Sequence, residues 1–230
     1  MPSRTRESRR ASHRDRPVPV ATGLLLSLFG VPLLGQIDIP RLVDVSATRS
    51  FLANSVVTWV VVGVLVAIVV YWERRPLTSF GLRIPSRREA TVGVGAGLVA
   101  VVLGVVAIGV AVATFQLEQP ETLSALGRLS VPVQFGIVVT AVVTEEILWR
   151  GYPIERLTEL TGSVWVGAGV SGVVFLAVHF PAWGIVGAVP QAVFTLVLVG
   201  VYVWSRNVVA CMISHGVINV LMILVLPRVI

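Results

Sequence analysis

The amino-acid sequence predicts an all-α, polytopic membrane protein: a bundle of about seven transmembrane helices, with a range of six to eight. The chain of 230 residues is 55% hydrophobic and only 13% charged, and its mean hydropathy is +0.88. A soluble domain carries about 25% charged residues, so this composition excludes a soluble globular protein and a disordered chain. The single cysteine excludes an internal disulfide and a cysteine-based zinc site.

Long apolar runs define the individual helices, because a helix needs roughly 20 apolar residues to cross a bilayer. Residues 1–16, rich in arginine and serine, are expected to form a flexible cytoplasmic tail, and residues 17–230 one transmembrane domain. Small residues in the third and fifth runs (Gly93, Gly97, Gly167, Gly169 and Gly172) are expected to let helices approach closely. The predicted spans are 18–37, 51–72, 90–115, 132–149, 163–180, 189–204 and 208–226.

Arginine placement predicts the orientation in the membrane. Six of the 18 basic residues lie in the first 16 positions. Cytoplasmic loops of membrane proteins carry such an excess, so we expect a multi-pass cell-membrane protein with a cytoplasmic N-terminus and no nucleic-acid partner. The fourth span then ends on the cytoplasmic side. Five more arginines lie in the loop after the second span: Arg74, Arg75, Arg83, Arg87 and Arg88.

Ionisable residues inside apolar helices identify a candidate site, since a charge in a membrane span costs several kcal/mol. The fourth span ends in Glu145 and Glu146, the fifth in His179, and the seventh contains His215 and Asn219. Adjacent glutamates on a helix point about 100° apart, so they are expected to have different roles.

Helical spacing separates these residues further. Glu146 and Arg150 are four apart, which predicts an intrahelical ion pair and leaves Glu145 without a local partner. In a hairpin that turns at residues 161–162, Glu145 and His179 each lie roughly 25 Å from the turn. We therefore expect them to be level, with His215 at a similar depth, in a cavity that faces the cytoplasm. Prolines at 181 and 190 suggest a broken or re-entrant link between spans five and six.

The chemistry of this set suits hydrolysis. A carboxylate and a histidine such as Glu145 and His179 can deprotonate a water, and His215 with Asn219 can donate hydrogen bonds to an oxyanion. The same side chains, Glu145, His179 and His215, are also a known kind of catalytic ligand set for Zn²⁺.

A serine or cysteine nucleophile fits the pattern less well. Ser214 adjoins His215 and so points to a different face. Cys211 lies one turn before His215, and a small buried hydrophobe is its expected role.

The polar residues form three motifs along the chain: Glu145-Glu146-x-x-x-Arg150, Phe175-x-x-x-His179 and His215-x-x-x-Asn219. In this order they resemble the CAAX-protease and bacteriocin-processing (CPBP, Abi-type) family, which includes the type II CAAX prenyl endopeptidases. Trp149 occupies a position where that family usually has phenylalanine. The resemblance extends over about residues 79–226, the expected protease core.

The resemblance implies an intramembrane endopeptidase acting on a membrane-associated protein or peptide, by either a metal-dependent or a glutamate-type mechanism. It implies that Glu145 and His179 activate water and that His215 and Asn219 stabilise the oxyanion. Glu146 and Arg150 would support the site.

Two other functions remain open at this point. The first is a membrane scaffold or an immunity or secretion factor of the same fold without proteolysis. The second is a proton-coupled transporter that uses Glu145 and the histidines as a relay, against which the absence of an internal repeat argues.

Overall fold

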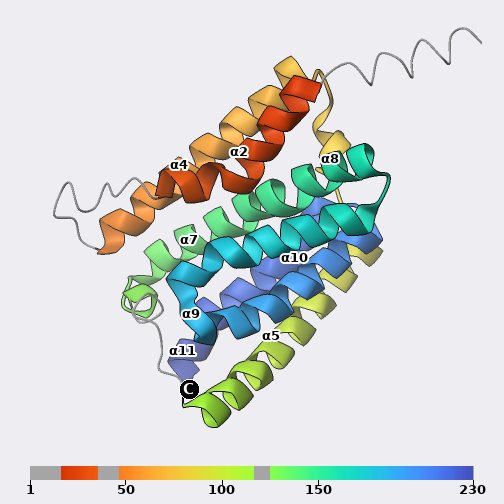
Figure 1. The fold of residues 1–230 in the computed structure, drawn as a ribbon. Coiled ribbons are helices and arrows are strands. Elements are labelled where there is room, and N and C mark those ends of the chain that lie inside the picture. The colour runs from red at the N-terminus through yellow and green to blue at the C-terminus, as the bar shows by residue number, and fades with distance from the viewer. Residues whose placement is uncertain (1–16, 36–46, 117–124, 230) are drawn as a thin grey trace, which may run out of the picture.

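The computed structural model describes residues 17–35, 47–116 and 125–229, and this part of the chain is a helical bundle without strands (Figure 1). Its seven long apolar segments confirm the predicted fold class and the predicted spans. The fourth span runs beyond its predicted end and the sixth starts earlier than predicted. The predicted tail at 1–16 lies outside the described residues. The segments are Pro17–Leu34, Thr48–Trp72, Arg87–Phe115, Val131–Thr161, Val164–Pro181, Trp183–Ser205 and Val208–Arg228.

An N-terminal hairpin forms one edge of the bundle. It consists of α2 (Pro17–Gly35) and α4 (Ala47–Ala67), and the π-helical turn η1 (Ile68–Trp72) extends α4. The two helices lie side by side in Figure 1. Their outer faces expose apolar side chains, with Leu25 63% and Val60 58% exposed, as expected for helices whose solvent is lipid.

The connection to the third span folds back onto the bundle. A 3₁₀ turn, η2 (Leu77–Phe80), precedes α5 (Arg87–Phe115). Ser86 and Glu89 form a capping box at the start of α5, in which each side chain accepts a hydrogen bond from the other residue's backbone N–H.

Glycines bring α5 against α10 (Val208–Asn219). A Cβ atom on Gly93 would lie 2.7 Å from the carbonyl oxygen of Ala210, and one on Gly97 would lie 2.7 Å from that of Ser214. The predicted close approach is confirmed for both glycines. It is wrong for Gly169, beside which a Cβ would meet nothing within 4 Å.

In the fifth span, Gly167 also permits a close contact, since a Cβ there would lie 2.7 Å from the carbonyl oxygen of Ile154. Gly172 has more room, because the nearest atom to a Cβ, on Thr195, is 3.6 Å away.

The fourth span is one continuous helical rod in three segments: α7 (Val131–Glu145), the π-helical turn η3 (Glu146–Gly151) and α8 (Tyr152–Thr161). It ends at Gly162, whose φ of 75° is a conformation that glycine adopts without strain. The helix α9 (Val164–Ser205) then begins, so the predicted turn is confirmed.

A single residue interrupts α9. Gly184 has φ 58° and ψ −167°, which separates the fifth span from the sixth between Pro181 and Pro190. The predicted break is therefore confirmed. After α9, the side chain of Asn207 caps α10, which continues into the π-helical turn η4 (Val220–Val225) and α11 (Leu226–Val229).

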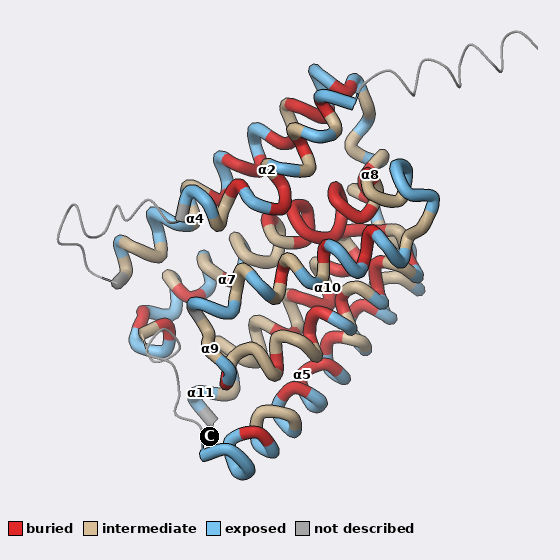
Figure 2. The backbone as a smooth tube through the Cα atoms, in the orientation of Figure 1, coloured by how far each residue is buried: buried red, intermediate tan, exposed pale blue. Residues whose placement is uncertain are grey.

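Buried residues gather where η3 and α8 meet α9 and α10, whereas the outer faces of α2, α4 and α5 are exposed (Figure 2). The core there includes Leu148, Tyr152 and Phe175, each at most 1% exposed. The candidate site is built on these elements.

Candidate active site

Two adjacent glutamates point to two different helices. Glu145, the last residue of α7, has its Oε1 3.8 Å from Nε2 of His179 on α9. Glu146, the first residue of η3, has its Oε1 2.7 Å from Nδ1 of His215 on α10. The structure thus brings together residues from three helices, as the sequence predicts, and arranges them as two glutamate–histidine pairs.

The imidazole of His179 is held in one orientation by its own helix. Its Nδ1 lies 2.7 Å from the carbonyl oxygen of Phe175. A carbonyl oxygen only accepts hydrogen bonds, so Nδ1 carries the proton. In the neutral ring, Nε2 therefore presents its lone pair toward Glu145.

A buried charge cluster supports the second pair. Glu146 also forms an ion pair with Arg150, 3.3 Å from Oε1 to Nη1, and their side chains are 0% and 1% exposed. The predicted intrahelical pair is confirmed, and His215 is its third member. The Arg150 guanidinium carbon lies 4.0 Å from the ring centroid of Phe175, a cation–π contact.

An aromatic cluster joins the two pairs. The rings of Phe175 and His179 have centroids 4.2 Å apart, and Trp149 lies edge-on to both at 5.3 and 5.8 Å. The tryptophan that replaces the usual phenylalanine therefore packs directly against His179. Contacts with Trp149 and Phe175 thus restrict the ring of His179 to a position facing Glu145.

The π turn that follows Glu145 has a local cause. Pro153 has no N–H to give to the carbonyl of Trp149, and the N–H of Tyr152 bonds to Ile147 instead of Leu148. Two carbonyl oxygens, of Leu148 and Trp149, therefore lose their helical donors.

Two serine hydroxyls from other helices replace those donors. Ser27 on α2 donates to the carbonyl oxygen of Leu148, and Ser171 on α9 donates to that of Trp149. Both serines are buried. The helix segment that carries both glutamates is thus fixed by side chains that lie far from it in the sequence.

Exposure distinguishes the two pairs. The side chains of Glu145 and His179 are 20% and 18% exposed, whereas those of Glu146 and His215 are 0% and 8% exposed. A water molecule must reach a group that activates it. The accessible pair therefore suits water activation, and the buried Glu146 suits the support of His215.

Asn219 ends α10, one helical turn beyond His215 on the same face. It is partly buried, and its amide makes no hydrogen bond to any residue that the structure describes. Its donor is therefore free for a ligand.

The residues fit a metal less well than the sequence suggests. Nδ1 of His215 is engaged by Glu146, and the described ranges contain no group of three His, Cys, Asp or Glu side chains arranged to hold an ion. The set Glu145, His179 and His215 is thus not assembled around one point.

The two alternative nucleophiles are buried. Cys211 is 0% exposed and packs in the core between α8, α9 and α10. Ser214 is also 0% exposed, and its hydroxyl has no hydrogen-bond partner within the described part of the chain. Neither position suits attack on a substrate.

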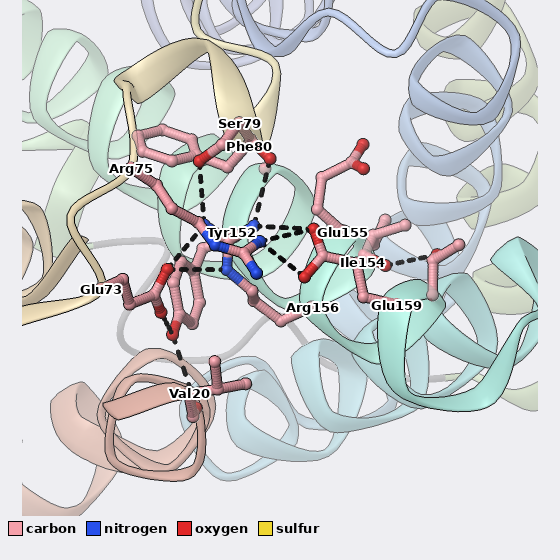
Figure 3. Close-up of polar contacts among 12 residues, drawn as sticks. Val20, Glu73, Arg75, Ser79, Phe80, Tyr152, Ile154, Glu155, Arg156 and Glu159 are labelled. Atoms are coloured by element: carbon pink, nitrogen blue, oxygen red, sulfur yellow. Dashed lines mark hydrogen bonds and ion pairs between the residues drawn. The ribbon is translucent and has the colours of Figure 1, made fainter. Parts of the chain in front are cut away.

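A second polar network, which the sequence does not reveal, lies at the end of the bundle beyond the site (Figure 3). Arg156 is fully buried and pairs with the buried Glu73, 2.7 Å from Nη2 to Oε2. Glu73 also accepts a hydrogen bond from the hydroxyl of Tyr152. The residues just after η3 are thereby joined to the end of η1, and the only sequence signal is that Glu73 directly follows an apolar span.

Comparison with known proteins supports the resemblance. Residues 127–221 match the family described as type II CAAX prenyl endopeptidase Rce1-like. The matched segment begins just before α7 and ends in η4, so it contains Glu145, His179, His215 and Asn219. No curated protein and no solved structure matched the chain.

Proposed function

Since residues 127–221 match the type II CAAX prenyl endopeptidase-like family, we propose that this multi-pass membrane protein is an intramembrane endopeptidase. Its substrate is a peptide bond of a membrane-associated protein or peptide. The observation that carries the proposal is the pairing of Glu145 with His179 across α7 and α9 at 3.8 Å, in a position with partial exposure.

Glu145 and His179 activate the water. The 3.8 Å between Oε1 and Nε2 is longer than a direct hydrogen bond, so one water can donate a hydrogen bond to each group. The water oxygen attacks the carbonyl carbon of the peptide, and its proton passes to the Glu145 carboxylate. When the C–N bond breaks, the protonated carboxyl returns this proton to the leaving amine.

His215 and Asn219 stabilise the oxyanion that forms on the carbonyl oxygen. Nδ1–H of His215 donates its hydrogen bond to the Glu146 carboxylate. Nε2 can therefore donate a hydrogen bond to the oxyanion only when the ring is an imidazolium, and the adjacent Glu146 carboxylate stabilises that charge. The free Asn219 amide supplies the second donor.

A metal-dependent scheme is the second candidate, because Glu145 and His179 face each other closely enough to share an ion. For His215 to act as a third ligand, its side chain would have to break its hydrogen bond with Glu146. Thorough dialysis against a chelator, followed by return of Zn²⁺, tests it: our proposal predicts unchanged proteolysis, and a loss that Zn²⁺ restores would favour the metal scheme.

The proposed activity is tested by comparing protein termini in membranes from cells that carry the wild type or Glu145→Gln at matched expression. Glu159→Gln is the control, since its side chain is 43% exposed and lies at the far end of α8. We expect specific termini to disappear in Glu145→Gln alone. If all three profiles match while a deletion still has a phenotype, the scaffold function is favoured over the enzyme.

A further inference from the structure

Four carboxylates of the described residues lie at the end of the bundle that contains the polar network of Figure 3. Each of them makes an ion pair with an arginine. Once these pairs are formed, the exposed Arg74, Arg87 and Arg88 have no carboxylate partner in the described ranges. The pairs are Glu73–Arg156, Glu89–Arg83, Glu155–Arg206 and Glu159–Arg75.

One of these arginines lies beside a tryptophan on a neighbouring helix. The guanidinium carbon of Arg88 is 5.6 Å from the ring centroid of Trp204, which lies near the end of α9. The exposed Arg87 directly precedes Arg88 and is the first residue of α5. Arg83 donates a hydrogen bond to the carbonyl oxygen of Ser205. This contact fixes the loop before α5 against the end of α9.

Apolar surface extends from this position toward the middle of the bilayer. On α9, Trp204, Gly200 and Leu196 are four residues apart and share one exposed face, with Leu196 73% exposed. On α5, Leu98 and Val102 are 49% and 62% exposed. A tryptophan at the edge of such a surface is typical of the membrane–water interface.

We propose that Arg87, Arg88 and Trp204 form a binding site for the headgroup of an anionic phospholipid. The phosphate lies against the two guanidinium groups, which bind phosphate oxygens in a bidentate way, and the acyl chains follow α5 and α9. An anionic lipid is preferred because the positive charge of a zwitterionic headgroup would be repelled by the two guanidinium groups. The site is separate from Glu145 and His179 and does not depend on the proposed proteolysis.

The test measures binding of phosphatidylglycerol and of phosphatidylcholine to the full-length protein in detergent, by native mass spectrometry. An arginine near an anionic lipid surface contributes about fivefold in affinity. We therefore expect the wild type to prefer phosphatidylglycerol, and Arg87→Gln/Arg88→Gln to lose about 25-fold in its affinity for that lipid.

The matched control is Arg74→Gln/Arg128→Gln, which removes the same charge from two exposed arginines that make no contact with Trp204. It should bind phosphatidylglycerol within twofold of the wild type. The proposal is overturned if the wild type binds both lipids equally, or if the control pair loses as much affinity as Arg87→Gln/Arg88→Gln. Equal unfolding temperatures of all variants in phosphatidylcholine verify that each is folded.

Discussion

Replacing Glu146 by glutamine removes one negative charge from a fully buried cluster and changes almost no volume. The side chain of Arg150, which is 1% exposed, then keeps its positive charge but loses the carboxylate that lies 3.3 Å from it in the wild type. Breaking a buried ion pair from one side costs about 3–5 kcal/mol of unfolding free energy. The cation–π contact with Phe175 persists in the variant, so it does not change this difference.

The neighbouring substitution Glu145→Gln is the matched control. It makes the same chemical change one residue earlier, at a side chain that is 20% exposed and has a histidine as its partner. We expect it to lose less than about 1 kcal/mol of stability. The two variants should therefore differ by about 2–5 kcal/mol in unfolding free energy. In a chain of this length each kcal/mol corresponds to about 2–4 °C in the midpoint of thermal unfolding, so their midpoints should differ by about 4–20 °C.

Thermal unfolding of the purified variants in one detergent, followed by tryptophan fluorescence, measures this difference. The double variant Glu146→Gln/Arg150→Met should recover most of the lost stability, because it leaves no unpaired charge. An unfolding midpoint for Glu146→Gln within 2 °C of that for Glu145→Gln would show that the buried Glu146–Arg150 pair does not stabilise the protein in this way.

Three further predictions concern the site and its packing. Glu145→Gln, His179→Ala and His215→Ala should each abolish proteolysis while the protein stays inserted and folded, as judged by membrane fractionation and gel filtration. Ser171→Ala should lower the unfolding free energy by about 1–3 kcal/mol, since the carbonyl of Trp149 loses its hydrogen-bond donor. Ser171→Thr keeps a hydroxyl and should therefore lose less stability than Ser171→Ala. Gly97→Leu should lower the unfolding midpoint more than Gly95→Leu, because only Gly97 faces α10 at close range.

The spans and the candidate residues could be predicted because membrane physics constrains the sequence strongly. The bilayer sets the length of each apolar run. Because an ionisable side chain inside a membrane span is costly, Glu145, His179 and His215 identify a functional site. Counting helical rise from the turn at residues 161–162 was enough to place Glu145 level with His179, which the 3.8 Å separation confirms.

The pairing of Glu146 with His215 could not be predicted. Helical geometry shows that Glu145 and Glu146 diverge, but which helix Glu146 faces depends on how α10 packs against the fourth span. The sequence assigned Arg150 alone to Glu146. The structure adds His215, which comes from a helix 69 residues further along the chain.

The π turn shows a second limit. Pro153 predicts a disturbed helix at this point, yet the disturbance is accommodated by hydroxyls of Ser27 and Ser171, which are 121 and 22 residues away from the carbonyls they bond. Arg156 illustrates the same limit, since its burial depends on Glu73 from another span. Local patterns do not encode such long-range partners.

The proposed mechanism requires Glu145 and His179 to act together on one water molecule. The most direct test measures the cleavage rate of a substrate found by the comparison of termini, using purified wild type, Glu145→Gln, His179→Gln and the double variant in lipid vesicles. General acid–base groups contribute about 10²–10⁴-fold, and groups that act as a unit are not additive. Each single variant should lose at least about 100-fold in cleavage rate, and the double variant should lose no more than the slower of the two single variants. Losses that multiply in the double variant, or a Glu145→Gln protein as active as the wild type, would exclude this joint role of the two side chains.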